Sequence, residues 1–164
     1  MSEKVYNVLY LCTGNSARSI MAEKLLAFWG KGRFCTYSAG SFPTGQVNPL
    51  ALQVLTAKQL STDGLRSKSW DEFSGTDAPL MDFFFTVCDN AKDAVCPVWP
   101  GHPVTGHWGV DDPAAVDGSD EDKLWAFKMV ANQLENPIKA FTSLRLESLD
   151  HLKLQQEIDA IAKV

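Results

Sequence analysis

The chain has 164 residues, of which 45% are hydrophobic and 21% are charged, and this is typical of one globular domain. Its formal net charge of −5 excludes a surface rich in Lys and Arg of the kind that binds nucleic acid. No stretch approaches the roughly 20 apolar residues of a membrane helix, and the N-terminus lacks a signal peptide, so we expect a cytoplasmic protein with reduced thiols and no membrane partner.

Strand and helix patterns alternate along the chain. Apolar runs rich in β-forming residues predict strands at 5–11, 34–38, 81–88 and 104–108. Apolar spacing and capping residues predict helices at 16–29, 49–59, 119–136 and 149–164, with Pro137 bending or restarting the third. Residues 68–78 are expected to be weakly structured. The alternation predicts a single α/β domain over 1–164, with a four-stranded parallel sheet flanked by helices and a C-terminal helical extension at about 140–164.

The segment CTGNSARS at 12–19 follows the first predicted strand and opens the first predicted helix. A strand-to-helix loop aims successive N–H groups inward and binds tetrahedral anions. Gly14 and Asn15 tolerate the left-handed dihedral angles that such a loop requires. Arg18 can bind two anion oxygens through its planar guanidinium. The segment therefore predicts an anion site formed by Thr13, Gly14, Asn15, Ser16, Ala17, Arg18 and Ser19.

Cys12 is the candidate nucleophile of this site. Helix N-termini and nearby cations lower the pKa of a cysteine from about 8.5 to roughly 3.5–7.5, so we expect a thiolate at neutral pH. The hydroxyl of Ser16 or Ser19 could hydrogen-bond to the sulfur. The competing interpretation is a buried structural cysteine at a strand end, with Arg18 on a solvated helix face. The coincidence of strand, glycine-containing loop, arginine spacing and helix favours the catalytic interpretation.

The run VLYLCTGNSARSIMAE at 8–23 closely resembles the arsenate reductases built on the low-molecular-weight protein tyrosine phosphatase fold. The resemblance continues through YSAG at 37–40, VCDN at 87–90, CP at 96–97, HWG at 107–109 and DPA at 112–114. It covers about the first 135 residues of the chain. It implies that fold, arsenate as the substrate, and reduction of arsenate to arsenite in arsenic detoxification.

A general acid is expected in the segment Asp111-Asp112-Pro113, within a Gly- and Pro-rich loop after the fourth predicted strand. Expelling hydroxide or an alkoxide from arsenic or phosphorus requires a proton donor near the leaving oxygen. Asp-Asp-Pro is also ordinary turn chemistry, so the spacing alone leaves both interpretations open. The resemblance implies that Asp112 is the acid.

Two further cysteines bear on the reaction. Cys88 ends the third predicted strand, and because the carboxyl ends of parallel strands meet at one edge, it could face the same crevice as Cys12. Cys96 follows in a short polar segment without proline. The resemblance implies a relay in which Cys12 attacks arsenate, Cys88 attacks Cys12 as arsenite leaves, and Cys96 carries the disulfide outward. It implies no tightly bound cofactor or metal, but an external reductant, either thioredoxin or a small thiol with glutaredoxin.

Two other functions fit parts of the sequence pattern. A phosphatase hydrolysing phosphomonoesters through a cysteinyl-phosphate would use the same anion loop, but phosphatases of this fold usually carry aromatic residues after the Asp-Pro, where this chain has Ala114-Ala115. A zinc binder could use Cys88, Cys96, His102 and His107, although seven residues separate the cysteines where compact zinc motifs have about two to four. His107 and Trp108 are more simply packing residues.

The sequence leaves one question open. Asn15 and Glu23 match positions at which some relatives bind a potassium ion, but the other ligands are not clearly matched around 67–69.

Overall fold

The computed structural model describes residues 5–73, 77–87 and 103–162. Its centre is a sheet of four parallel strands in the order β2-β1-β3-β4. The strands are β1 (Tyr6–Cys12), β2 (Phe34–Gly40), β3 (Phe83–Thr86) and β4 (Val104–His107). The predicted four-stranded parallel sheet is therefore confirmed. The third strand ends at Thr86, earlier than predicted, and Cys88 lies outside the described residues.

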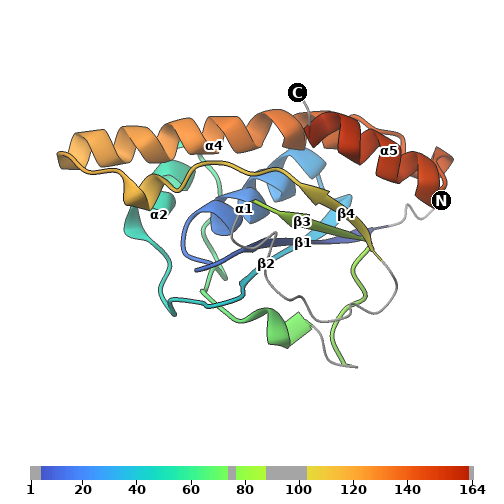
Figure 1. Ribbon diagram of the computed structural model, residues 1–164, viewed down its shortest axis with the longest axis horizontal. Helices are drawn as coiled ribbons and strands as arrows, with labels where there is room; N and C mark the ends of the chain where they lie inside the picture. The colour runs from blue at the N-terminus through green and yellow to red at the C-terminus, as the bar shows by residue number, and fades with distance from the viewer. Residues whose placement is uncertain (1–4, 74–76, 88–102, 163–164) are drawn as a thin grey trace.

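The helices are α1 (Arg18–Gly30), α2 (Pro49–Ala57), α4 (Asp120–Thr142) and α5 (His151–Ala162), with short 3₁₀ turns η1 (Trp70–Phe73), η2 (Pro113–Ala115) and η3 (Leu146–Ser148). Figure 1 shows α1, α4 and α5 on one side of the sheet and η1 on the other. The C-terminal helix α5 packs on β4 and on α4, so the predicted helical extension covers the edge strand of the sheet. Across the described ranges, no helix is both long and apolar enough to cross a membrane.

Helix α4 runs past the predicted boundary at Asn136 and continues through Pro137 to Thr142, so the proline does not restart the helix. A proline inside a helix removes one main-chain hydrogen bond and costs about 3 kcal/mol. The residues around it, Leu134, Ile138 and Phe141, are fully buried against the core, and their burial offsets that cost. The helix also begins with a capping box between Ser119 and Asp122.

The core holds the carboxyl end of β1 in place. Residues 8–11 of β1 are fully buried, and aromatic rings from β3, the segment after β4 and α4 pack beside them. Phe85 and Trp108 stack with ring centroids 4.0 Å apart, and Phe141 meets Phe85 edge-on at 5.3 Å. Trp108 is therefore a core residue, as expected. The loop that follows β1 therefore begins at a strand whose side chains are fixed by packing in the core.

Candidate active site

The predicted anion loop begins at Cys12, the last residue of β1, and its carbonyl groups are held from outside. The main-chain N–H groups of Ser41, Phe42, Thr44 and Asn48 donate to the carbonyl oxygens of Cys12, Thr13, Gly14 and Ser16, respectively, at 2.8–3.3 Å. In a trans peptide a carbonyl and the following N–H point in opposite directions. The N–H groups of residues 13, 14, 15 and 17 therefore point away from this outer segment. Several amides aimed inward form the kind of nest that binds a tetrahedral anion.

The close fit of the loop against β2 depends on Gly40. A Cβ atom at this position would lie 2.5 Å from the carbonyl oxygen of Thr13, a distance that real Cβ atoms do not show. Asn15 is fully buried and adopts the left-handed conformation with φ of 47°, which confirms the prediction for this residue. Gly14 does not adopt a positive φ, so Asn15 alone supplies the left-handed conformation in this loop. One left-handed residue is sufficient to turn the chain from strand to helix.

A directed chain of hydrogen bonds ends at the cysteine. The main-chain N–H of Lys68 donates to Oδ1 of Asn15 at 2.9 Å, and Nδ2 of Asn15 donates to Oγ of Ser19 at 2.8 Å. Ser19 Oγ lies 3.0 Å from Cys12 Sγ. A thiolate sulfur has no hydrogen to give, so when Cys12 is ionised the Ser19 hydroxyl is the donor of this contact. The structure thus selects Ser19, rather than Ser16, as the hydroxyl partner of Cys12, and a donor at this place stabilises a thiolate.

Arg18 and Asp112 lie close together in space, although 94 positions separate them in the chain. Arg18 Nη1 donates to the carbonyl oxygen of Val110 at 3.2 Å, and Nη2 is 3.9 Å from Oδ2 of Asp112. Asp112 caps η2, because its Oδ1 accepts from the N–H of Ala114 at 3.0 Å. Its side chain is 46% exposed. The predicted anion ligand and the predicted acid are therefore brought together, and Arg18 lies six residues after Cys12 at the other end of the anion loop.

Two buried charged residues lie behind the loop. Glu23 accepts a hydrogen bond from the hydroxyl of Ser38 at 2.6 Å. Burial raises the pKa of Glu23 above its ordinary value, while the Ser38 hydrogen bond and the charge of Lys68 lower it again in part. Burial also lowers the pKa of Lys68, which the charge of Glu23 raises again in part. Sequence analysis missed Lys68, because a lysine in a segment rich in Ser, Asp and Gly carries no sign of burial.

The relay cysteines Cys88 and Cys96 lie outside the described residues, as does His102. Their predicted roles therefore stay predictions. His107 is described, and its Nδ1 lies 2.6 Å from Oγ1 of Thr86, which fits the packing role expected for it. Within the described part of the chain, no group of three or more His, Cys, Asp or Glu residues is arranged to hold a metal ion.

The fold and this loop define a class of protein. It is a parallel α/β sheet whose first strand leads into an anion loop that starts with a buried cysteine and ends with an arginine at a helix start. The model of the low molecular weight phosphotyrosine protein phosphatase family matches residues 7–156. The chain belongs to this family. The match runs into α5 and so includes part of the C-terminal extension.

Relatives within this fold carry two kinds of name. A protein named arsenate reductase from Oceanobacillus iheyensis is 36% identical over 145 residues, which cover 86% of this chain and 96% of the relative. The crystal structure of an arsenate reductase from Archaeoglobus fulgidus superposes with a TM-score of 0.64 at 25% identity, covering 84% of this chain and 99% of that one. The tyrosine phosphatase Wzb from Escherichia coli K30 has a TM-score of 0.66 at 23% identity, with 84% and 96% covered, and shares the fold.

Proposed function

We propose that this chain reduces arsenate to arsenite, with Cys12 as the nucleophile. The observation that carries the proposal is the place of Cys12 Sγ, buried at the start of the anion loop and 3.0 Å from the hydroxyl of Ser19. This geometry suits attack on any tetrahedral oxyanion and does not separate arsenate from phosphate. The choice of arsenate is supported by relatives named arsenate reductase that are 36–37% identical over 86% of the chain.

In the first step the loop amides and Arg18 hold arsenate, and the thiolate of Cys12 attacks the arsenic atom. A sulfur–arsenic bond forms and an arsenic–oxygen bond breaks. Asp112 gives its proton to the departing oxygen, which leaves as water. The 3.9 Å distance between Arg18 Nη2 and Asp112 Oδ2 supports this assignment, since it places the carboxyl group, which must be protonated for this step, next to the side chain expected to hold the anion.

In the second step we assign the attacking thiol to Cys88. Its thiolate attacks the sulfur of Cys12, a disulfide forms, and the electron pair of the broken sulfur–arsenic bond stays on arsenic, which leaves as arsenite. Arsenic gains two electrons and the two sulfurs lose them. Cys96 then attacks Cys88, which frees Cys12 as a thiolate and leaves a Cys88–Cys96 disulfide. The match of both cysteines to the family's relay positions supports this step.

An external thiol reductant must supply two electrons to reduce that disulfide before the next cycle. We propose a thioredoxin-like protein or a small thiol with glutaredoxin as the reductant, acting in the cytoplasm, where thiols are kept reduced. The reaction requires no tightly bound cofactor, since the cysteines carry both electrons.

The test is a single turnover with arsenate and no reductant. We expect stoichiometric arsenite, the loss of two thiols, and a Cys88–Cys96 disulfide in the peptide map. The Cys96→Ser variant should stop at a Cys12–Cys88 disulfide, and Cys12→Ser should form no arsenite. An unchanged thiol count together with rapid turnover of a phosphomonoester would reject the reductase and favour the phosphatase. The exposed Ala114-Ala115 after the Asp-Pro argues against an aryl phosphate substrate.

A further inference from the structure

Two residues of opposite charge are buried behind the anion loop, and each partly offsets the effect of burial on the pKa of the other. Glu23 in α1 and Lys68, in the segment before η1, are each only 9% exposed. Within the described residues, Lys68 is the only buried Lys or Arg, and Glu23 is the only buried Asp or Glu. The Nζ atom of Lys68 donates to the carbonyl oxygen of Arg66 at 3.0 Å. A buried charge is costly unless an opposite charge or hydrogen bonds compensate it. The opposite charges of Glu23 and Lys68 therefore lower the cost of burying each other.

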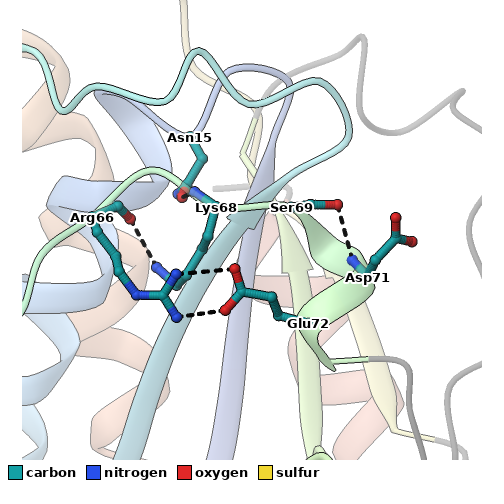
Figure 2. Close-up of polar contacts among 6 residues, drawn as sticks. All are labelled: Asn15, Arg66, Lys68, Ser69, Asp71 and Glu72. Carbon is teal, nitrogen blue, oxygen red and sulfur yellow. Dashed lines mark hydrogen bonds and ion pairs between the residues drawn. The ribbon is translucent and has the colours of Figure 1, made fainter.

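The main chain of Lys68 contacts the anion loop at Asn15, and Figure 2 shows these two residues side by side. Its N–H donates to Oδ1 of Asn15, and its carbonyl oxygen accepts from the N–H of Gly40 at 2.9 Å. The neighbouring Ser67 donates its hydroxyl to the carbonyl oxygen of Gly14 at 3.1 Å. Lys68 is thus fixed between the end of β2 and the residue that orients Ser19.

The other charged groups near the pair lie further out. Arg66 binds Glu72 of η1 through both guanidinium nitrogens, and both side chains are largely exposed (Figure 2). Lys24, next to Glu23 in α1, donates to the carbonyl oxygen of Asp63. Exposed charges are screened by water, whereas a buried charge acts at full strength over a short distance. The charge balance directly beneath the loop is therefore set by Glu23 and Lys68.

We propose that Lys68 is a positioning residue for Cys12, whose ammonium group neutralises Glu23 beneath the anion loop while its main-chain N–H aligns Asn15 and Ser19 toward the sulfur. Without the ammonium group, the nearest buried charge behind a thiolate-bearing loop is a carboxylate, which opposes a second negative charge. The inference rests on the proposed function in one respect, that Cys12 acts as a thiolate.

Substitutions of the pair should move the titration of Cys12 in opposite directions. Lys68→Met keeps the main-chain contacts of this residue and removes the charge together with the hydrogen bond from Nζ to Arg66, so the midpoint of the Cys12 thiol titration should rise by about half to one unit. Glu23→Gln keeps an acceptor for Ser38 and should lower the midpoint. The double variant should return to within about 0.3 units of the wild type. The midpoint is measured from the pH dependence of iodoacetamide alkylation, with mass spectrometry to separate Cys12 from the other cysteines.

The directions of the midpoint shifts distinguish an effect of charge from an effect on the folded structure of the loop. If the pair only supports the fold, both single variants loosen the loop and shift the midpoint in the same direction, which would overturn the inference. Lys58→Met is the matched control, because Lys58 also pairs with a glutamate, Glu135 at 3.3 Å, but joins α2 to α4. It should leave the midpoint unchanged. Should Lys68→Met not fold, Glu23→Gln alone decides, since an unchanged or raised midpoint contradicts the proposal.

The same experiments separate this inference from the proposed function. If the wild-type protein forms no arsenite, but the two variants shift the Cys12 midpoint in opposite directions, arsenate reduction is rejected and the role of Lys68 is retained. Protein that reduces arsenate at the wild-type rate after Lys68→Met, with an unchanged Cys12 titration, would retain the reductase and reject the role of Lys68.

Discussion

Arg18 and Asp112 are joined directly, with Nη2 of the arginine 3.9 Å from Oδ2 of the aspartate. Arg18 stands in the first turn of α1, and Asp112 caps η2 beyond the end of β4. A second contact, from Nη1 of Arg18 to the carbonyl oxygen of Val110, attaches the same guanidinium to the main chain of the acid loop. The group expected to bind the anion therefore also holds the loop that carries the expected acid.

The first prediction concerns Arg18→Lys, which keeps the charge but removes the planar fork. A lysine ammonium cannot bind two anion oxygens and the acid loop together. We expect kcat/KM for arsenate to fall by about 10–100-fold, with a rise in KM and a fall in kcat. Steady-state kinetics with excess reductant measures both constants.

Arg33→Lys is its control. Arg33 also donates to two main-chain carbonyl oxygens, of Thr142 and Leu144, but lies just before β2, at the opposite end of that strand from the anion loop. Its replacement should leave both kinetic constants of the folded protein unchanged. Equal effects of the two substitutions would show that the loss at Arg18 is a stability effect.

Asp112→Asn gives the second prediction. Asparagine can still cap η2 through its carbonyl oxygen but does not deliver a proton, so turnover should fall by about 10²–10⁴-fold while the thermal midpoint stays close to the wild type. The Asp111→Asn variant changes the neighbouring exposed carboxylate and should retain turnover within about threefold. Undiminished turnover in Asp112→Asn would remove this residue from the reaction.

The third prediction separates the two serines of the loop. Ser19→Ala removes the hydroxyl 3.0 Å from Cys12 Sγ, so the midpoint of the thiol titration should rise by about one unit. Ser16→Ala should have no such effect, because Ser16 contributes its main-chain carbonyl oxygen to the loop, and that contact survives the substitution. The pH dependence of Cys12 alkylation measures both. Equal shifts would mean that the hydroxyl of Ser19 is not the specific partner of the sulfur.

The sequence predicted the parts of this site that lie within one local segment. Strand, loop and helix from β1 to α1 follow from apolar periodicity and from residue types that suit a turn, and the structure has them where they were expected. The approach of Gly40 to Thr13 and the choice of Ser19 over Ser16 could not be predicted in this way. Both depend on distances between segments that periodicity does not contain.

At Lys68 and at Pro137 the local sequence pattern also fails to predict the structure. A lysine among polar residues predicts a solvated loop, yet the main chain of Lys68 is held by Asn15 and Gly40, and its side chain is only 9% exposed. A proline predicts a break, yet the core contacts of its neighbours keep α4 continuous. In both cases tertiary packing outweighs a local preference, and a local pattern carries no information about the packing partner.

The last prediction uses the pH dependence of stability. Burial raises the pKa of Glu23, so the folded protein binds a proton at this carboxyl more tightly than the unfolded chain, whose value is near 4.5. As the pH is lowered from 8 through the pKa of Glu23 in the folded protein, the free energy of unfolding of the wild type should therefore rise relative to that of Glu23→Gln. This difference should level off below about pH 4.5, where the carboxyl group is protonated in the unfolded chain as well. Urea unfolding of both proteins across this range measures it.

Ser38→Ala makes that prediction more specific. The hydroxyl of Ser38 lowers the pKa of Glu23 by donating to its carboxylate, so removing it should make the same trend begin at a higher pH. The comparison requires Glu23→Gln in both backgrounds, so that all other titrating groups cancel. A difference that stays flat with pH in both backgrounds would mean that Glu23 is not held as a buried carboxylate beneath the anion loop. The charge that Lys68 is proposed to neutralise would then be absent, and the opposite shifts expected at Cys12 would lose their physical cause.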